Sequence, residues 1–274
     1  MNIIQKLNNR IDEVSSLLCI GLDSELEKIP IYLHAERYPQ YIFNKAIIDA
    51  THALVCAYKP NIAFYEERGE KGMKELKMTM DYLRTKYPEI ITICDAKRAD
   101  IGNTNKGYVA HIFDYLGFDA VTLHPYLGKE ALQPFLDRKD KANIILCRTS
   151  NPGAGELQDL PVKGEPLYMH VARMVSEKWN ENGNCMLVVG ATYPEEMKKV
   201  RSIVGVTPFL VPGIGAQGGD VEKSVKAGID ENGRGMIINS ARGIIFASGG
   251  TDFAKRAKEE AANLRTTINK FRII

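Results

Sequence analysis

Eight short apolar runs recur along the 274-residue chain, and each is bounded by glycine, proline, asparagine or aspartate. Short runs rich in β-branched and apolar residues predict β-strands. The runs lack the apolar/polar alternation of a half-exposed sheet, which favours parallel strands covered on both faces. The predicted strands are residues 17–23, 54–60, 90–97, 119–125, 143–149, 185–191, 207–213 and 235–241.

Segments with helical periodicity separate these strands. Residues 103–117, 193–205 and 218–228 begin near Asn, Pro or Asp and end at Gly, which are the residues expected at helix ends. Residues 258–271 predict a closing helix. Strand and helix alternation at this frequency is typical of a TIM (β/α)8 barrel rather than of a doubly wound sheet. We therefore expect one α/β barrel domain over residues 1–274.

Two segments between the predicted elements exceed the median length of a connection. Residues 24–40 follow the first predicted strand, and residues 150–166 follow the fifth. Long loops usually serve function or are disordered. The carboxyl-terminal end of a barrel is where active sites collect, so we expect these loops to close over a site there.

The composition limits the possible partners and compartments. Lys and Arg number 36 against 34 Asp and Glu, so no bulk charge favours nucleic acid or a membrane surface. No apolar run approaches the roughly 20 residues that a membrane-spanning helix needs. Five cysteines lie in apolar runs without zinc-binding spacing, which predicts buried free thiols in a reducing cytoplasm. They are Cys19, Cys56, Cys94, Cys147 and Cys185.

Opposed charges collect where the third predicted strand ends, in "ITICDAKRADIGNT", residues 91–104. Asp95 and Lys97 are two apart and would face the same side of an extended strand. Lys59 ends the neighbouring second strand at the same level. Asp95 and Lys97 alone equally predict a structural ion pair, but the second lysine favours an alternating array with an ammonium directed at a cavity. Asp100 alone is also consistent with a charge stabilising a helix start.

The segment "DAKRADIGNT" resembles the Asp-x-Lys-x-x-Asp-Ile-x-x-Thr signature of orotidine 5'-phosphate decarboxylases, and Lys59 completes that family's Lys-Asp-Lys-Asp array. The similarity continues through "LCIGLD", "TSNPG", "VPGIGAQGGD" and "NSARGI", in order along nearly the whole chain. "YKPNIAFYE" is most similar to the type 2 branch. The resemblance implies a barrel that converts orotidine 5'-monophosphate to UMP and CO2 in pyrimidine biosynthesis, with neither metal nor organic cofactor.

The resemblance also implies roles for the charged residues. Lys97 would stabilise the carbanion that forms at pyrimidine C6 and then protonate it. Asp95 would face the departing carboxylate, and Lys59 would hold the array and contact the ribose. A homodimer is implied, in which the partner subunit contributes Asp100, Ile101 and Thr104. Without the family, Ile101 equally predicts core packing and Thr104 a hydroxyl in the first turn of a helix.

Further residues would bind the substrate according to the same resemblance. Asp23 and Asn61 would lie near the ribose, with Asn61 possible near the phosphate as well. Ser150 would contact the amide edge of the pyrimidine, although "TSNPG" alone favours an ordinary turn. The phosphate residues would be Pro212, Gly215, Gln217, Ala241 and Arg242. "SARG" stands around Arg242 where many relatives have Gly-Arg-Ser, so the role of Ala241 is the less secure of the two.

Other functions are consistent with parts of the sequence. "GIGAQG" matches a dinucleotide-binding pattern, but its place after the seventh strand favours a monophosphate. A magnesium-dependent decarboxylase of a sugar acid phosphate, such as 3-keto-gulonate 6-phosphate, shares Asp-x-Lys, and a Schiff-base aldolase would use a lysine. A non-catalytic nucleotide-binding protein is the alternative that is not an enzyme. The four-residue array together with "TSNPG" favours the pyrimidine substrate.

Overall fold

The computed structural model describes residues 2–214 and 218–272. Within these residues, eight parallel strands close into a barrel in the order β1-β10-β9-β8-β5-β4-β3-β2. Each overlaps one predicted strand, so the predicted TIM barrel is confirmed. The barrel strands are β1 (Leu18–Gly21), β2 (Ala57–Lys59), β3 (Ile91–Arg98), β4 (Ala120–Leu123), β5 (Ala142–Arg148), β8 (Cys185–Val189), β9 (Phe209–Val211) and β10 (Met236–Ser240).

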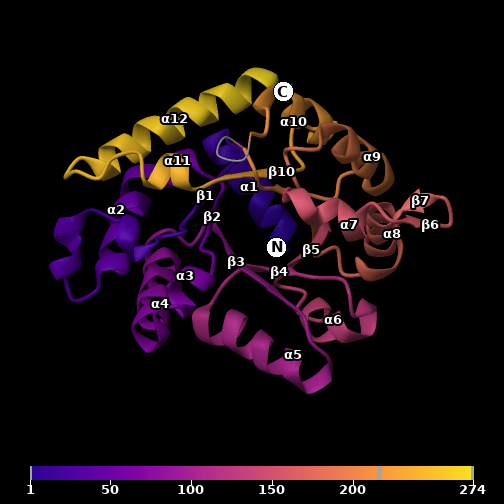
Figure 1. The fold of residues 1–274 in the computed structure, drawn as a ribbon, viewed down its shortest axis with the longest axis horizontal. Coiled ribbons are helices and arrows are strands. Elements are labelled where there is room, and N and C mark those ends of the chain that lie inside the picture. Colours follow the sequence, from indigo (N-terminus) through magenta and orange to yellow (C-terminus); the bar gives the residue numbers. More distant parts are fainter. Residues whose placement is uncertain (1, 215–217, 273–274) are drawn as a thin grey trace.

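Helices surround the barrel, and the long helix α12 packs along the outside against α2 (Figure 1). The strands are therefore covered on both faces, which explains their nearly continuous apolar runs. The helices are α1 (Ile3–Val14), α2 (Pro39–Thr51), α3 (Ala63–Glu66), α4 (Gly69–Lys86), α5 (Gly102–Val109), α6 (Gly128–Leu136), α7 (Gly155–Gln158), α8 (Leu167–Met174), α9 (Pro194–Val204), α10 (Val221–Gly228), α11 (Arg242–Ile245) and α12 (Phe253–Phe271). The helix predicted over 258–271 is confirmed as the second part of α12.

Two of the three helices predicted between the strands match their predictions, and the third begins differently. Helices α9 and α10 lie within the predicted segments, and the Asp220 carboxylate caps α10 by accepting the N–H of Lys223. The segment 103–117 instead forms α5 and the π-helix η4 (Ala110–Leu116). The predicted cap at Asn103 is wrong, since the N-cap residue of α5 is Ile101. The chain before the helix is held by Asn105, which accepts the N–H of Asp100 and donates to its carbonyl.

The first helix, α1, lies across the amino-terminal end of the barrel. Arg10 donates hydrogen bonds to the carbonyls of His52 and Val55, which precede β2. Lys6 forms an ion pair with Asp119, which precedes β4. Because these contacts all lie before the strands begin, the opposite, carboxyl-terminal end is the one that remains open to substrates.

The two long connections differ in where they lie. The segment after β5 forms α7 and a hairpin of β6 (Pro161–Val162) and β7 (Glu165–Pro166), and its first residues line the central pocket. The segment after β1 forms the short 3-10 turns η1 (Leu26–Lys28) and η2 (Ile31–Ala35), and no described residue of 24–40 lines that pocket. Of these two segments, only the one after β5 is therefore placed to cover a site at this pocket.

All five cysteines are buried and free, as predicted. Burial raises the pKa of Cys56, Cys147 and Cys185 to about 12, so the reactive thiolate form is rare at neutral pH. Among the described helices, none is both long and apolar enough to cross a lipid bilayer.

Candidate active site

A pocket of about 470 Å³ opens at the carboxyl-terminal end of the barrel strands. Strand ends from most of the barrel contribute to it, as expected of a catalytic barrel. It brings together nine residues that the sequence predicted for the site: Asp23, Lys59, Asn61, Asp95, Lys97, Ser150, Pro212, Ala241 and Arg242. Gly215 and Gln217, which were also predicted, lie outside the described residues.

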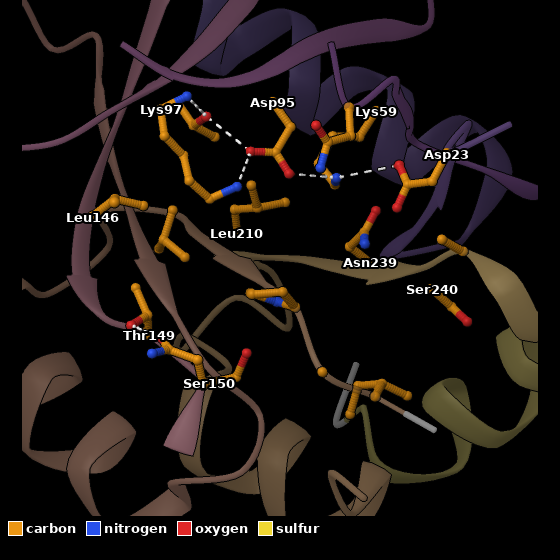
Figure 2. A pocket seen from close by; sticks show the side chains of 18 of the residues that line it. Asp23, Lys59, Asp95, Lys97, Leu146, Thr149, Ser150, Leu210, Asn239 and Ser240 are labelled. Carbon is orange, nitrogen blue, oxygen red and sulfur yellow. Dashed lines mark hydrogen bonds and ion pairs between the residues drawn. The ribbon is translucent and has the colours of Figure 1, made fainter. Parts of the chain in front are cut away.

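The charged side chains form an unbroken row along one wall of the pocket, with Asp95 between the two lysines (Figure 2). Lys97 Nζ lies 2.6 Å from Asp95 Oδ1, and Lys59 Nζ lies 2.8 Å from Asp95 Oδ2. Beyond Lys59, Asp23 Oδ1 lies 3.9 Å from the same ammonium. The array thus runs Lys97, Asp95, Lys59, Asp23, from three neighbouring strands.

Burial and pairing determine the charge states in the row. Burial opposes the charge on Lys59, but Asp23 and Asp95 outweigh that effect and raise the pKa of its ammonium. Burial likewise opposes the charge on Asp95, but Lys59 and Lys97 hold the pKa of this carboxyl well below its ordinary value. Both groups therefore stay ionised at neutral pH. The Lys97 side chain is 52% exposed, so of the two lysines in the row its ammonium is the one open to a ligand.

Asp23, at the other end of the row, has weaker partners than Asp95. Burial raises the pKa of its carboxyl, and the attraction of Lys59 offsets this only in part. Among the described residues, neither Asp23 Oδ1 nor the nearby Asn239 Oδ1 has a hydrogen-bond donor, although both atoms are buried. Buried acceptors without donors are costly, and they are common where a ligand completes the site.

The side chains of Asp95 and Lys97 lie close together for a different reason from the one that the sequence predicted. The sequence predicted a regular strand with both side chains on one face. Instead, four steps on β3, from Cys94 to Arg98, lie opposite two steps on β4, and Lys97 adopts a left-handed φ of 47°. The two side chains face the pocket through a bulge rather than through simple strand alternation.

The loop after β5 forms the facing wall. Thr149 and Ser150 line the pocket there, below the charged row in Figure 2. Gly190, after β8, lets this loop approach closely, because a Cβ at that position would lie 2.8 Å from the Ser150 backbone. Gln158 accepts the backbone N–H of Thr149 and fixes the start of the loop.

A third part of the pocket has glycine-rich backbone and one arginine. Gly213, with φ of 99°, and Pro212 follow β9, while Ala241 and Arg242 follow β10. Arg242 is the first residue of α11, and its side chain is exposed at the pocket edge. Turns after the last two strands of a barrel commonly bind phosphate through backbone N–H groups.

Three predicted residues do not line the pocket: Asp100, Ile101 and Thr104. They lie at the start of α5, on the side of the bulge away from Asp95. Ile101 is 60% exposed, so the alternative of core packing is wrong.

Eleven pocket residues were not predicted: six lie within barrel strands and five in the segments that follow strands. A polar residue near the carboxyl-terminal end of a predicted strand was the available signal, as for Thr122 and Asn239. Whether such a residue faces the pocket depends on strand register, which the sequence does not reveal. The unpredicted lining residues are Thr122, Leu146, Thr149, Asn151, Gln158, Val188, Leu210, Gly213, Ile214, Asn239 and Ser240.

Comparisons with known proteins identify the family of the chain. A family model described as "Orotidine 5'-phosphate decarboxylase / HUMPS family" matches residues 16–257. The orotidine 5'-phosphate decarboxylase of Cellvibrio japonicus is 51% identical over 271 residues, which cover 98% of each protein. A solved OMP decarboxylase of Leishmania donovani is 37% identical, with a TM-score of 0.86 over 99% of both chains. The UMP synthase of that organism is 38% identical with a TM-score of 0.88, and this chain spans 57% of its length.

Proposed function

The chain belongs to the orotidine 5'-phosphate decarboxylase / HUMPS family, and we propose on this premise that it converts orotidine 5'-monophosphate to UMP and CO2 in pyrimidine biosynthesis. The observation that carries the proposal is the row of Lys97, Asp95, Lys59 and Asp23 in the central pocket. The full-length relatives named for this activity favour it over a sugar acid phosphate decarboxylase.

The chemistry requires a cation beside pyrimidine C6. When the bond between C6 and the carboxylate breaks, its electron pair stays on C6, and the ring does not delocalise it. We propose that the Lys97 ammonium, the exposed cation of the row, stabilises this charge and then transfers a proton from Nζ to C6. The proton is replaced from solvent after UMP leaves.

Asp95 contributes through its fixed negative charge. Its carboxylate stays ionised beside the two lysines and would lie near the carboxylate of the substrate. Repulsion between the two carboxylates would raise the energy of the bound substrate and be relieved as neutral CO2 departs. Lys59 holds Asp95 in place from the other side.

Substrate binding would use the rest of the pocket. Hydroxyl groups of the ribose are donors that suit the unpartnered acceptors of Asp23 and Asn239, with Asn61 beside them. Ser150 would contact the pyrimidine edge. We propose that the phosphate lies against Pro212, Ala241 and Arg242, and that Gly215 and Gln217 complete its site. Phosphate binding far from C6 supplies energy that can be used in the transition state.

We propose that the reaction uses neither metal nor organic cofactor, because the lysines supply the positive charge. Turnover that is indifferent to EDTA is the expected result, and inhibition by EDTA would favour the magnesium-dependent alternative. A cytoplasmic location is part of the proposal, since the five thiols are free.

The central experiment follows the loss of orotidine monophosphate absorbance with the wild type and with Lys97→Ala. Loss of the general acid alone costs roughly 10²–10⁴-fold, and loss of the stabilising charge adds to it. Lys198→Ala, on a surface helix, is the matched control and should retain full activity. A wild type that binds UMP but leaves orotidine monophosphate intact would favour a non-catalytic binding protein. Borohydride trapping of substrate would instead favour a Schiff-base aldolase.

We also propose that the active form is a homodimer, with Asp100, Ile101 and Thr104 contributed in trans. Their absence from the lining of this subunit's pocket supports the proposal. Inactive Lys97→Ala and Asp100→Asn subunits should regain part of the activity when mixed, because one of the two hybrid sites then has both native residues. Absence of recovery after verified subunit exchange would contradict the contribution of Asp100 in trans.

A further inference from the structure

One buried hydroxyl group connects the irregular end of β3 to the charged row. Thr122, on β4, is 1% exposed and lies opposite the bulge. Its Oγ1 accepts the backbone N–H of Ala96 at 3.0 Å and that of Lys97 at 2.9 Å. The same Oγ1 donates to Asp95 Oδ1 at 3.0 Å.

These three bonds use the full capacity of the hydroxyl group, which has one proton and two lone pairs. Because the two N–H groups occupy the lone pairs, the proton must point at Asp95. The direction of each bond is thereby fixed. The bulge removes the N–H groups from regular pairing with β4, and Thr122 provides the acceptor that they would otherwise lack.

The bond to Lys97 matters because this residue has an unfavourable backbone conformation. A φ of 47° is rare for a residue with a side chain and must be maintained by its surroundings. The Lys97 ammonium is also bonded to Asp95 Oδ1, at 2.6 Å. Thr122 therefore holds the backbone from which the Lys97 side chain starts and the carboxylate at which that side chain ends.

We propose that Thr122 is a positioning residue for the decarboxylation, which acts through Lys97 and Asp95. The inference rests on the proposed function. Without the hydroxyl, the backbone at Lys97 can relax toward negative φ, and the ammonium moves away from the carbon that it must protonate. Displacement of a reacting group by about 1 Å can cost on the order of 10²-fold in rate.

Thr122→Val is the principal test, because valine has nearly the shape of threonine but no hydroxyl. We expect kcat to fall about 10²-fold, while KM changes little because the phosphate and ribose contacts remain. Thr122→Ser keeps the hydroxyl and should stay within a few-fold of wild type. The acid limb of the kcat profile should also move to higher pH in Thr122→Val, because Asp95 loses a donor that favours its ionised form.

The chain provides a matched control at the other end of the barrel. Thr92, on β3, is also buried, and its hydroxyl donates to the Asp119 carboxylate and accepts the Asp119 backbone N–H. Thr92→Val makes the same change beside a partly buried carboxylate away from the pocket. It should lower thermal stability and leave kcat and its pH profile unchanged, whereas a purely structural role for Thr122 would make the two variants alike.

The outcomes separate this inference from the proposed function. An inactive wild type would contradict the decarboxylase itself. An active wild type with a folded Thr122→Val whose kcat is within threefold of normal would contradict the role of Thr122, as would a Thr122→Ser that is equally impaired. UMP binding and circular dichroism establish that the variants are folded. If valine prevents folding, Thr122→Ala and Thr122→Ser give the same comparison.

Discussion

The two carboxylates on either side of Lys59 share one ammonium but differ in every other respect. Asp95 lies 2.8 Å from Lys59 Nζ, receives a second lysine and the Thr122 hydroxyl, and has a lowered pKa. Asp23 lies 3.9 Å from the same ammonium, has one oxygen without a donor, and has a raised pKa. Both carboxylate oxygens of Asp95 thus have hydrogen-bond donors, whereas one oxygen of Asp23 has none among the described residues.

The difference indicates which part of the site is complete before a ligand arrives. The Asp95 end has its full set of partners within the protein, as expected of a fixed electrostatic environment for reaction. The Asp23 end leaves acceptors that a ligand's hydroxyl groups would satisfy. Under the proposed function, the Asp95 end is preorganised for the reaction and the Asp23 end for substrate binding.

The largest expected effect is the loss of the Asp95 charge. Asp95→Asn leaves two lysines without their shared carboxylate, and removing one member of a buried pair typically costs about 3–5 kcal/mol. Urea unfolding at pH 7 measures this loss. Asp81→Asn, in the half-exposed pair with Lys77, is the control and should cost about 1 kcal/mol or less. Similar losses of stability in the two variants would contradict the stronger contribution of the Asp95 charge.

Asp23→Asn should act in the opposite direction. Because burial disfavours the charge on Asp23, a neutral amide should leave the free energy of unfolding equal to that of wild type or raise it by about 1 kcal/mol, the order of one unsatisfied buried group. The same variant should bind UMP more weakly in calorimetry, since the proposed contact between Asp23 and the ribose is lost. A destabilisation as large as that of Asp95→Asn would show that the two carboxylates are equivalent.

The effects of pH on stability are expected to be smaller and to differ in sign between Asp95 and Asp23. The lowered pKa of Asp95 gives stability that is present above its ordinary value of 3.8 and is lost as pH falls toward the folded-state value. The raised pKa of Asp23 has the opposite sign: its favourable contribution is present below 3.8 and is lost as pH rises through the folded-state value. In urea unfolding from pH 3 to 7, the deficit of Asp95→Asn should shrink toward acid, and any advantage of Asp23→Asn should vanish there.

The sequence was sufficient for the barrel because each strand is a local apolar run, and local runs do not depend on distant partners. It also identified Lys59, Asp95 and Lys97, because charges after such runs lie at the carboxyl-terminal end of the barrel. The bulge at Lys97 was not predictable, since it arises from pairing with β4, some 25 residues further along. The role of Thr122 and the open acceptor of Asn239 depend on the same three-dimensional register.

The burial of every cysteine has a consequence for site-specific fluorescent labelling of this protein. A maleimide dye reacts with thiolates, and buried thiols of raised pKa should scarcely react in the folded protein. A cysteine introduced at exposed Glu156, in the short helix beside the pocket, would then take up the dye selectively. Fluorescence from that position could report on the β5 loop as nucleotide enters and leaves, without removal of any native cysteine.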